Sequence, residues 1–273
     1  MAQQTRTLTT KEIQLRLKSV SNIAKITKSM KMIASTKVNK ATRNMEVARA
    51  YGQSSNSFFK LAETQEPEAK NELVIAVSSD RGLCGGIHSS ISKGVKKHLA
   101  KHENVQLVTL GQKVKAQLSR AARDQFVYSF EAVAKNLPTW TESALIADTL
   151  IKQGVTFDSA KIFYNKFNSV ISYECTPISI FTEDVIAASP QIAKYEVDEA
   201  ELKNFEEFAM ANSLYWAIAE GYASEMAAKR AAMENATKNA DEMIQKLTIT
   251  YNRSRQAAIT NELIDIITGA SAM

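Results

Sequence analysis

Apolar and small residues recur at alternating steps of three and four along the first part of the chain. The series begins at Ile13 and continues through Leu17, Val20, Ala24, Thr27, Met30, Ala34, Val38, Ala41, Met45 and Ala48. Such a spacing averages about 3.5 residues, which is the repeat of a coiled-coil seam. The sequence therefore predicts a long N-terminal helix that turns one face towards another helix.

A second, thinner series lies near the C-terminus, with gaps at Lys229 and Asn261. Its members are Tyr222, Met226, Met233, Ala236, Ala240, Met243, Leu247, Thr250, Ser254, Ala257 and Ile264. Small residues let two helix axes approach closely, but each buries little apolar area, at about 25 cal/mol per Å². We therefore expect neither helix to be stable without the other.

Glycine and proline, which interrupt helices, are concentrated in the middle of the chain. All nine glycines and four prolines lie between Gly52 and Gly221, except Gly269. Residues 1–51 and 222–268 can therefore each form a helix of roughly 70 Å. We expect the chain to leave the first helix, build a domain and return antiparallel to it. The alternative is that both ends pack on the central domain as surface helices, but typical helices have only about 11–12 residues.

Strand-like and helix-like segments alternate in the middle of the chain. Strands are predicted at 73–77, 105–110, 126–130, 161–164 and 170–173, and helices at 87–101, 112–122 and 141–153. This alternation predicts a small α/β domain with a parallel sheet. The expected fold is α+β: a long antiparallel coiled coil of N- and C-terminal helices with an inserted Rossmann-like α/β domain. The expected divisions are a coiled-coil helix at 1–60, a head domain at 70–195 and a second coiled-coil helix at 202–270.

Positive charge is concentrated in the first helix. Residues 1–51 hold eleven Lys or Arg against Glu12 and Glu46, a net charge of +9, whereas the whole chain of 273 residues carries +5. Such a face can bind phosphates, anionic lipid or an acidic protein, or it can simply be solvated. Single-stranded nucleic acid is disfavoured, because Tyr51 is the one aromatic residue in this segment and stacking needs several. Duplex binding by a basic helix stays open.

Several classes of function have no support in the sequence. Cys84 and Cys175 form no CxxC pair, and His88, His98 and His102 lack evident partners, so no metal or other cofactor is expected. No stretch approaches 18 consecutive apolar residues, so any membrane role is expected to run through a partner.

The turn at 78–86 has the composition of a phosphate-binding loop but not its spacing. It contains neither GxGxxG nor a terminal Gly-Lys-Ser/Thr, so a tight turn is the expected role. Asp80, Glu142 and Asp148 offer carboxylates, but no paired-carboxylate, Ser/His/Asp or Cys/His arrangement has persuasive spacing. We expect no catalytic residues. A nucleotide-dependent enzyme that uses the loop from Asp80 to Gly86 remains an alternative.

Three motifs resemble those of the ATP synthase gamma subunit family. The C-terminal run ITNELIDIITGAS at 259–271 resembles the family signature, 16–20 with 26–34 resembles its N-terminal helix, and SDRGLCG at 79–85 resembles its central motif. The resemblance covers nearly the whole chain. The chain lacks the long cysteine-bearing insertion of the chloroplast type, and its short ending after Gly269 looks mitochondrial and fungal-like.

The resemblance implies a non-catalytic rotor that couples hydrogen ion transport to ATP synthesis. By resemblance, the two helices are inserted in a ring of alternating alpha and beta subunits. The head would lie against the membrane ring of c subunits, with the small central-stalk subunits delta and epsilon as further partners. As a member of the mitochondrial type, the chain would act at the matrix side of the mitochondrial inner membrane as a peripheral component. Membrane contact would then run only through partners, and no nucleic acid is expected.

The resemblance also implies contact residues. An Arg-Gln pair of the family that contacts a beta subunit corresponds to Arg255 and Gln256, with Arg253 nearby. The basic helix would face an acidic loop of the beta subunits through Lys18, Lys25, Lys28 and Lys31. The helix end would turn in a hydrophobic bearing and includes Thr260, Glu262, Ile264, Ile266, Ile267, Gly269 and Ala270. The rival hypothesis is a basic coiled-coil protein that binds nucleic acid or anionic membrane.

Overall fold

The structure is a computed structural model that describes residues 9–67, 71–102 and 104–271. The chain forms two compact units, one within Met1–Ile33 and Ala232–Met273 and the other over Ala34–Ala231. The three-part division expected from the sequence, at 1–60, 70–195 and 202–270, remains a prediction. Among the described residues, no helix is apolar over a length that would cross a bilayer.

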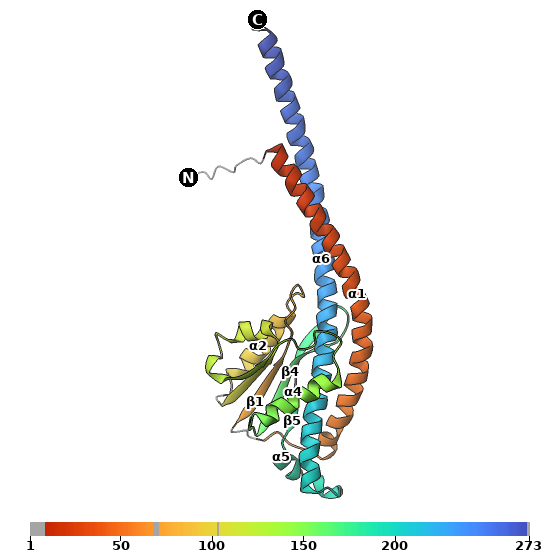
Figure 1. Cartoon of the computed structure of the whole chain (residues 1–273), viewed down its shortest axis with the longest axis vertical. Coiled ribbons are helices and arrows are strands. Elements are labelled where there is room, and N and C mark those ends of the chain that lie inside the picture. The colour runs from red at the N-terminus through yellow and green to blue at the C-terminus, as the bar shows by residue number, and fades with distance from the viewer. Residues whose placement is uncertain (1–8, 68–70, 103, 272–273) are drawn as a thin grey trace. The chain divides into compact units, whose positions relative to one another are not determined.

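Two long helices supply the ends of the chain, as the sequence predicts. Helix α1 runs over Thr10–Leu61, 52 residues, and α6 over Glu199–Ser271, 73 residues (Figure 1). Every predicted seam position of α1, from Ile13 to Ala48, is buried or half-buried. The amphipathic pattern therefore located the contact face of this helix correctly.

The seam of α6 differs from its prediction at four positions. Met243, Thr250, Ala257 and Ile264 are exposed, and Ile244 and Tyr251, the neighbours of the first two, are half-buried instead. From Ala240 the buried face advances by four residues to Ile244 rather than by three. This register turns the larger branched and aromatic side chains inward, which buries more apolar area than the predicted register would.

The first unit is an antiparallel helix pair held partly by polar contacts. The hydroxyl groups of Thr10 and Ser254 are 2.9 Å apart, and the Thr237 hydroxyl donates to that of Thr27 over 2.9 Å. Nζ of Lys31 lies 3.0 Å from Oε1 of Glu234. Low residue numbers on α1 thus face high numbers on α6, which confirms the antiparallel arrangement.

A five-stranded sheet of order β3-β2-β1-β4-β5 forms the centre of the second unit. Strands β1 to β4 pair in parallel, and β5 pairs antiparallel with β4. The strands are β1 Glu72–Val77, β2 Val105–Leu110, β3 Phe126–Phe130, β4 Ser159–Phe167 and β5 Tyr173–Phe181. The helices between and after them are α2 Ile87–Leu99, α3 Gln112–Leu118, α4 Trp140–Lys152 and α5 Glu183–Ala187, with 3-10 turns at Arg123–Gln125 and Ile192–Lys194.

The expectation of a wholly parallel sheet is therefore wrong at its β5 edge. Parallel strands need a crossover of a dozen or more residues, whereas only a short turn separates Phe167 from Tyr173. Val170 and Ile171, predicted as strand, lie in that turn, where Ile171 is 88 % exposed. The helix predicted at 112–122 ends at Leu118, ahead of the 3-10 turn.

Each face of the sheet is covered by helices. On one face, Leu73, Ile75 and Ile162 share a buried cluster with residues of α4, α1 and α6. On the other face, Val74 and Leu107 pack with residues of α2 and α3. Figure 1 shows α2 and α4 on opposite sides of the strands. The strands alternate their side chains between these two layers, as a doubly covered parallel sheet requires.

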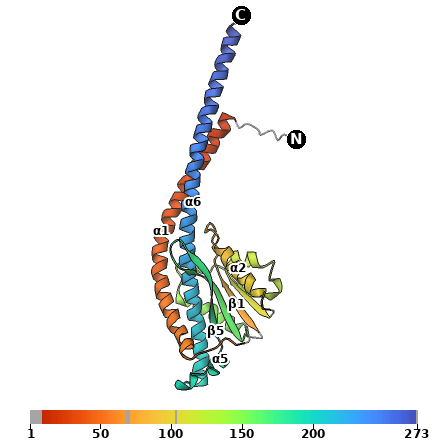
Figure 2. The ribbon, with the colours of Figure 1, turned by 180° about the vertical axis from the view of Figure 1, so that it is seen from behind.

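A smaller aromatic cluster closes one end of this unit. Phe59 of α1 contacts Phe181 at the end of β5, with ring centroids 5.1 Å apart. Ile186 of α5 and Leu202 of α6 are buried with them. Figure 2 shows α5 beside the first turns of α6. The cluster joins the ends of α1 and β5 to the start of α6.

Helix α6 is buried on nearly all sides where it crosses the sheet. Over residues 209–227 only Trp216 and Gly221 are half-buried, and the rest are buried. Two carboxylates lie in this stretch, Glu220 and Glu225. Because a buried charge is costly unless it is paired, the partners of these two groups are central to the packing.

Glu220 joins three elements. Its Oε1 lies 2.6 Å from Nη2 of Arg49 in α1 and accepts a hydrogen bond from the backbone N–H of Phe167 over 2.9 Å. Its Oε2 accepts from Nε of Arg49 and from Nε1 of Trp216. Arg49 in turn donates to the carbonyl of Phe167. The carboxylate is therefore fully satisfied by α1, β4 and α6.

Glu225 ties α6 to the loop after β1. Its two oxygens accept from Nε and Nη2 of Arg81 over 2.6 and 3.1 Å, and the guanidinium lies 4.8 Å from the ring centroid of Tyr222. Arg81 also donates to the carbonyl of Lys135. The neighbouring Asp80 accepts from the backbone N–H groups of Gln112 and Ala132. Asp80 and Arg81 thus both hold the loop at 78–86 in place through hydrogen bonds to other parts of the unit.

Gly52 marks a close approach of α1 and α6 in this unit. A Cβ at this position would lie 2.8 Å from Cβ of Trp216. Since the contact is near the backbone of both helices, neither side can move away without shifting a helix. The glycine in the interior of α1 is therefore required by packing, not by a turn.

We expect Gly52→Ala to lower the free energy of unfolding by roughly 1–3 kcal/mol, because overpacking forces the two helices apart. Gly221→Ala is the matched control. Gly221 is also helical, but its added Cβ would meet Cγ1 of Val77 at an ordinary 3.8 Å. The control should be neutral or more stable by up to about 1 kcal/mol, from helix propensity. Denaturant unfolding followed by circular dichroism measures both; equal effects would contradict the close approach.

We also expect Glu225→Gln to destabilise the chain by roughly 3 kcal/mol, because it leaves the largely buried guanidinium of Arg81 without its countercharge. Asp148→Asn is the control, since Asp148 pairs with Lys152 on an exposed helix face. Exposed pairs contribute only about 0.3–0.5 kcal/mol. A loss for Glu225→Gln as small as that of the control, in the same unfolding measurement, would refute the anchoring role of this pair.

Candidate functional site

The first candidate surface lies on α6 beyond Tyr251. Arg253, Arg255 and Gln256 are exposed, whereas Tyr251 and Ser254 are half-buried on the face towards α1. Among the described residues, the side chains of Arg253, Arg255 and Gln256 have no hydrogen bond or ion pair. Their charge and hydrogen-bond donors are therefore available to another molecule.

The helix continues past this point as an exposed apolar end. All seven predicted bearing residues, Thr260, Glu262, Ile264, Ile266, Ile267, Gly269 and Ala270, are exposed. Ile264 and Ile267 lie on one face, one turn apart, and Ile266, which is 70 % exposed, lies on another. Leu263 and Ile259 extend this apolar surface. Apolar side chains exposed on more than one side of a helix mark a contact surface.

The predicted lysines lie on α1 in the same unit. Lys18, Lys25 and Lys28 are exposed, and Lys31 is half-buried beside Glu234. Lys25, Lys28 and Lys31 line a groove of about 410 Å³ between α1 and α6, together with Glu234 and Asp241 of α6. The structure thus brings three of the four lysines together, next to carboxylates of this chain's own α6.

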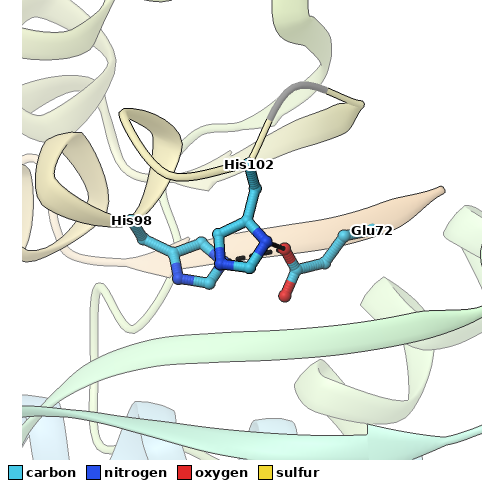
Figure 3. Close-up of side chains that lie close together, drawn as sticks. All are labelled: Glu72, His98 and His102. Atoms are coloured by element: carbon cyan, nitrogen blue, oxygen red, sulfur yellow. Dashed lines mark hydrogen bonds and ion pairs between the residues drawn. The ribbon is translucent and has the colours of Figure 1, made fainter. Parts of the chain in front are cut away.

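A different cluster lies in the second unit, at the edge where the parallel strands begin. Glu72 is the first residue of β1, and His98 and His102 lie at and just beyond the end of α2. Nε2 of His98 is 2.8 Å from Oε2 of Glu72, and Nδ1 of His102 is 3.6 Å from the same oxygen. Figure 3 shows both rings directed at this one carboxylate.

The two carboxylate oxygens of Glu72 have different partners. Oε1 of Glu72 faces Nζ of Lys161 at 3.5 Å, and Lys161 also pairs with Glu66. Burial is the largest effect on His98 and lowers its pKa, which favours the neutral imidazole, although Glu72 acts in the opposite direction. A cavity of about 470 Å³ adjoins the site and is lined by Glu66, Glu72, His102 and Lys161, among others.

Sequence reasoning missed this cluster. The available signal is the spacing of four between His98 and His102, which is the spacing of residues on one helix face, although His102 lies three residues beyond the end of α2. Glu72 lies on another element, and its proximity depends on how α2 packs on β1. The expectation that these histidines lack partners is therefore wrong, because the fold supplies a carboxylate to both.

The buried thiol of Cys84, within the loop at 78–86, is not a reactive nucleophile. Sγ of Cys84 lies 3.0 Å from Nε2 of His88, and Ser78 is hydrogen-bonded to the other ring nitrogen. Burial is the main cause that raises the pKa of Cys84 to about 11. A thiol with that pKa stays protonated at neutral pH, so this Cys/His pair lacks the thiolate that nucleophilic chemistry needs.

Comparisons with known proteins agree over nearly the whole chain. The sequence profile of the family described as ATP synthase matches residues 9–273. The mitochondrial ATP synthase subunit gamma of Pichia angusta is 46 % identical over 97 % of this chain and 99 % of that protein. The mitochondrial ATP synthase F(1) complex subunit gamma of Rattus norvegicus is 45 % identical over the same shares.

A solved structure is similar as well. A chain from the cryo-EM structure of the central stalk and c-ring of the Tetrahymena thermophila mitochondrial ATP synthase is 31 % identical. The match covers 77 % of this chain and 99 % of that one, with a TM-score of 0.66. These matches agree with the resemblance carried by the three sequence motifs, and the chain belongs to the ATP synthase gamma subunit family.

Proposed function

We propose that this chain is the rotor shaft of a mitochondrial ATP synthase. The observation that carries the proposal is the first unit: an antiparallel helix pair whose longer member continues as one exposed helix over 255–271. In a chain of the gamma subunit family, that surface fits insertion into a surrounding protein ring. The chain works from the matrix side of the inner membrane as a peripheral component of the complex.

The shaft couples rotation to chemistry by presenting different faces in turn. Arg253, Arg255 and Gln256 lie on one segment of α6, and the lysines at 18, 25, 28 and 31 lie on α1. The two helices are unlike in charge and side-chain size, so a surrounding beta subunit meets a different surface at each angle. Because the shaft contacts the different conformations of the beta subunits unequally, its rotation shifts the nucleotide affinities of those subunits.

The proposed partners follow from this arrangement. Alpha and beta subunits surround the helix pair, while the c-ring and the small delta and epsilon subunits contact the head. The exposed isoleucines at 264, 266 and 267 turn in an apolar bearing that the ring supplies. Hydrogen ion transport through the membrane sector drives the turning, and contact with the membrane itself runs through partners.

We further propose that the chain contributes no catalytic residue. The carboxylates singled out in the sequence all have structural contacts. Asp80 accepts from two backbone N–H groups, Glu142 accepts from the N–H of Ala134, and Asp148 pairs with Lys152. The buried Cys84 stays protonated, as described above. ATP synthesis then takes place in the partner subunits.

The composition of the native complex tests the proposal. The complex is purified through a tag on this chain, and its mass, subunit stoichiometry and ATPase activity are measured together. We expect one copy of this chain with three alpha-type and three beta-type subunits. A homo-oligomer without such partners would refute the rotor function. Salt-sensitive binding to DNA or anionic vesicles without any protein partner would favour the rival hypothesis instead.

Replacing both Arg255 and Gln256 by Ala should lower ATP synthesis in the reassembled complex. A hydrogen bond to a charged group contributes about 1.5–3 kcal/mol, so the rate should fall by about tenfold or more. Since both side chains are exposed, the unfolding transition of the isolated chain should not change.

Lys246→Ala is the matched control for this double variant. It also removes an exposed cation from α6, but from a position outside the predicted contact residues. ATP synthesis should stay within about twofold of the parent in the control, as is usual for an exposed surface substitution. An equal loss in the control and the double variant would show a general charge effect and would count against specific contacts at Arg255 and Gln256.

A further inference from the structure

The cluster of Glu72, His98 and His102 has the chemistry of a transition-metal site. It offers two imidazole nitrogens and a carboxylate oxygen, and one such atom from each residue lies within 4.8 Å of the others. Two histidines and one glutamate are a known donor set for zinc. The contacts proposed above for the rotor function do not name these residues, which belong to the second unit.

The distances fit a tetrahedral ion. With bonds of about 2.0–2.2 Å, neighbouring ligand atoms of a tetrahedral zinc site are about 3.3–3.5 Å apart. The carboxylate oxygen of Glu72 is 2.8 Å from Nε2 of His98 and 3.6 Å from Nδ1 of His102, which brackets that spacing. The two imidazole rings are stacked, with centroids 4.2 Å apart and planes 24° apart, so the side chains must rotate before both nitrogens point at one ion (Figure 3).

The charges around this place act on a cation in both directions. His98 lies in the last turn of α2, a helix of 13 residues, where the helix dipole is negative, but Lys96 and Lys97 lie in the same turn. Lys161 opposes a cation, but it approaches the other oxygen of Glu72 and shares its charge with Glu66.

We propose that Glu72, His98 and His102 bind a zinc ion. Oε2 of Glu72, Nε2 of His98 and Nδ1 of His102 are the three ligands, and the proton that Nε2 now donates to Glu72 moves to Nδ1 of His98. The fourth position faces the adjoining cavity of about 470 Å³, where a water molecule completes the shell. The ion would fix the end of α2 to the first residue of β1.

Zinc binding to the purified full chain tests this site. The chain is stripped with a chelator and dialysed against a zinc buffer, and bound metal is measured by mass spectrometry. We expect one zinc per chain. Cobalt(II) bound at the same site should give the intense visible absorption of a tetrahedral complex. Wild-type protein that takes up no zinc, or no cobalt with that spectrum, would overturn the proposal.

The key variant is His102→Asn, because His102 is the most exposed ligand and its loss endangers the fold least: its side chain is 45 % exposed. We expect the zinc dissociation constant to rise by about tenfold or more, as one of three protein ligands is lost. Lys101→Ala is the matched control, an adjacent exposed residue without a ligand role, and should bind zinc as the parent does.

The remaining outcomes also decide the question. Unchanged zinc affinity in His102→Asn would place the ion elsewhere, for example at Cys84 and His88, and would refute this site. His98→Asn should weaken zinc binding at least as much, provided that its circular dichroism spectrum matches the parent. If that variant does not fold, the comparison of His102→Asn with Lys101→Ala stands on its own.

Discussion

Two buried carboxylates on one helix determine how the second unit is assembled. Glu220 and Glu225 lie about one turn apart on α6, and each must find a positive partner because an unpaired buried charge is strongly destabilising. Arg49 of α1 meets the first, and Arg81 of the loop after β1 meets the second. These two pairs fix α6 in rotation and in register, against α1 on one side and against the sheet on the other. The packing of Gly52 on Trp216 and the burial of residues 209–227 are consistent with this rotation and register of α6.

Helix α6 therefore performs two different tasks along its length. Over 209–227 it is a core helix, buried on nearly all sides, and its alanines and Gly221 admit close neighbours. Beyond Met233 it exposes most of its surface and keeps one narrow seam through Ala240, Ile244 and Leu247. A single amphipathic pattern cannot describe both parts. This change explains why the C-terminal series is thinner in the sequence, although it belongs to a continuous helix.

How much of the fold and of the candidate sites can be predicted from the sequence depends on how far apart in the chain the interacting residues lie. The seam of α1 and the strands β1, β2 and β3 follow local periodicity, and the sequence located them well. The direction of β5 and the choice of Ile244 over Met243 depend on packing between distant segments, which periodicity does not contain. The same applies to the meeting of Glu72 with His98 and His102. The contact residues from Arg253 to Ala270 came from family motifs. Their exposure fits that assignment, but their partners lie outside the chain, so they remain predictions.

The order of the elements in the chain also has a consequence for biosynthesis. All five strands are translated before the segment of α6 that covers one face of the sheet, with residues such as Met210, Leu214 and Ile218. Until that segment leaves the ribosome, Leu73, Ile75 and Ile162 have no helix from the C-terminal end to cover them. Long-range contacts of this kind slow folding and leave apolar surface open to aggregation. A nascent chain that stalls before α6 would therefore expose the apolar side chains of one face of its sheet.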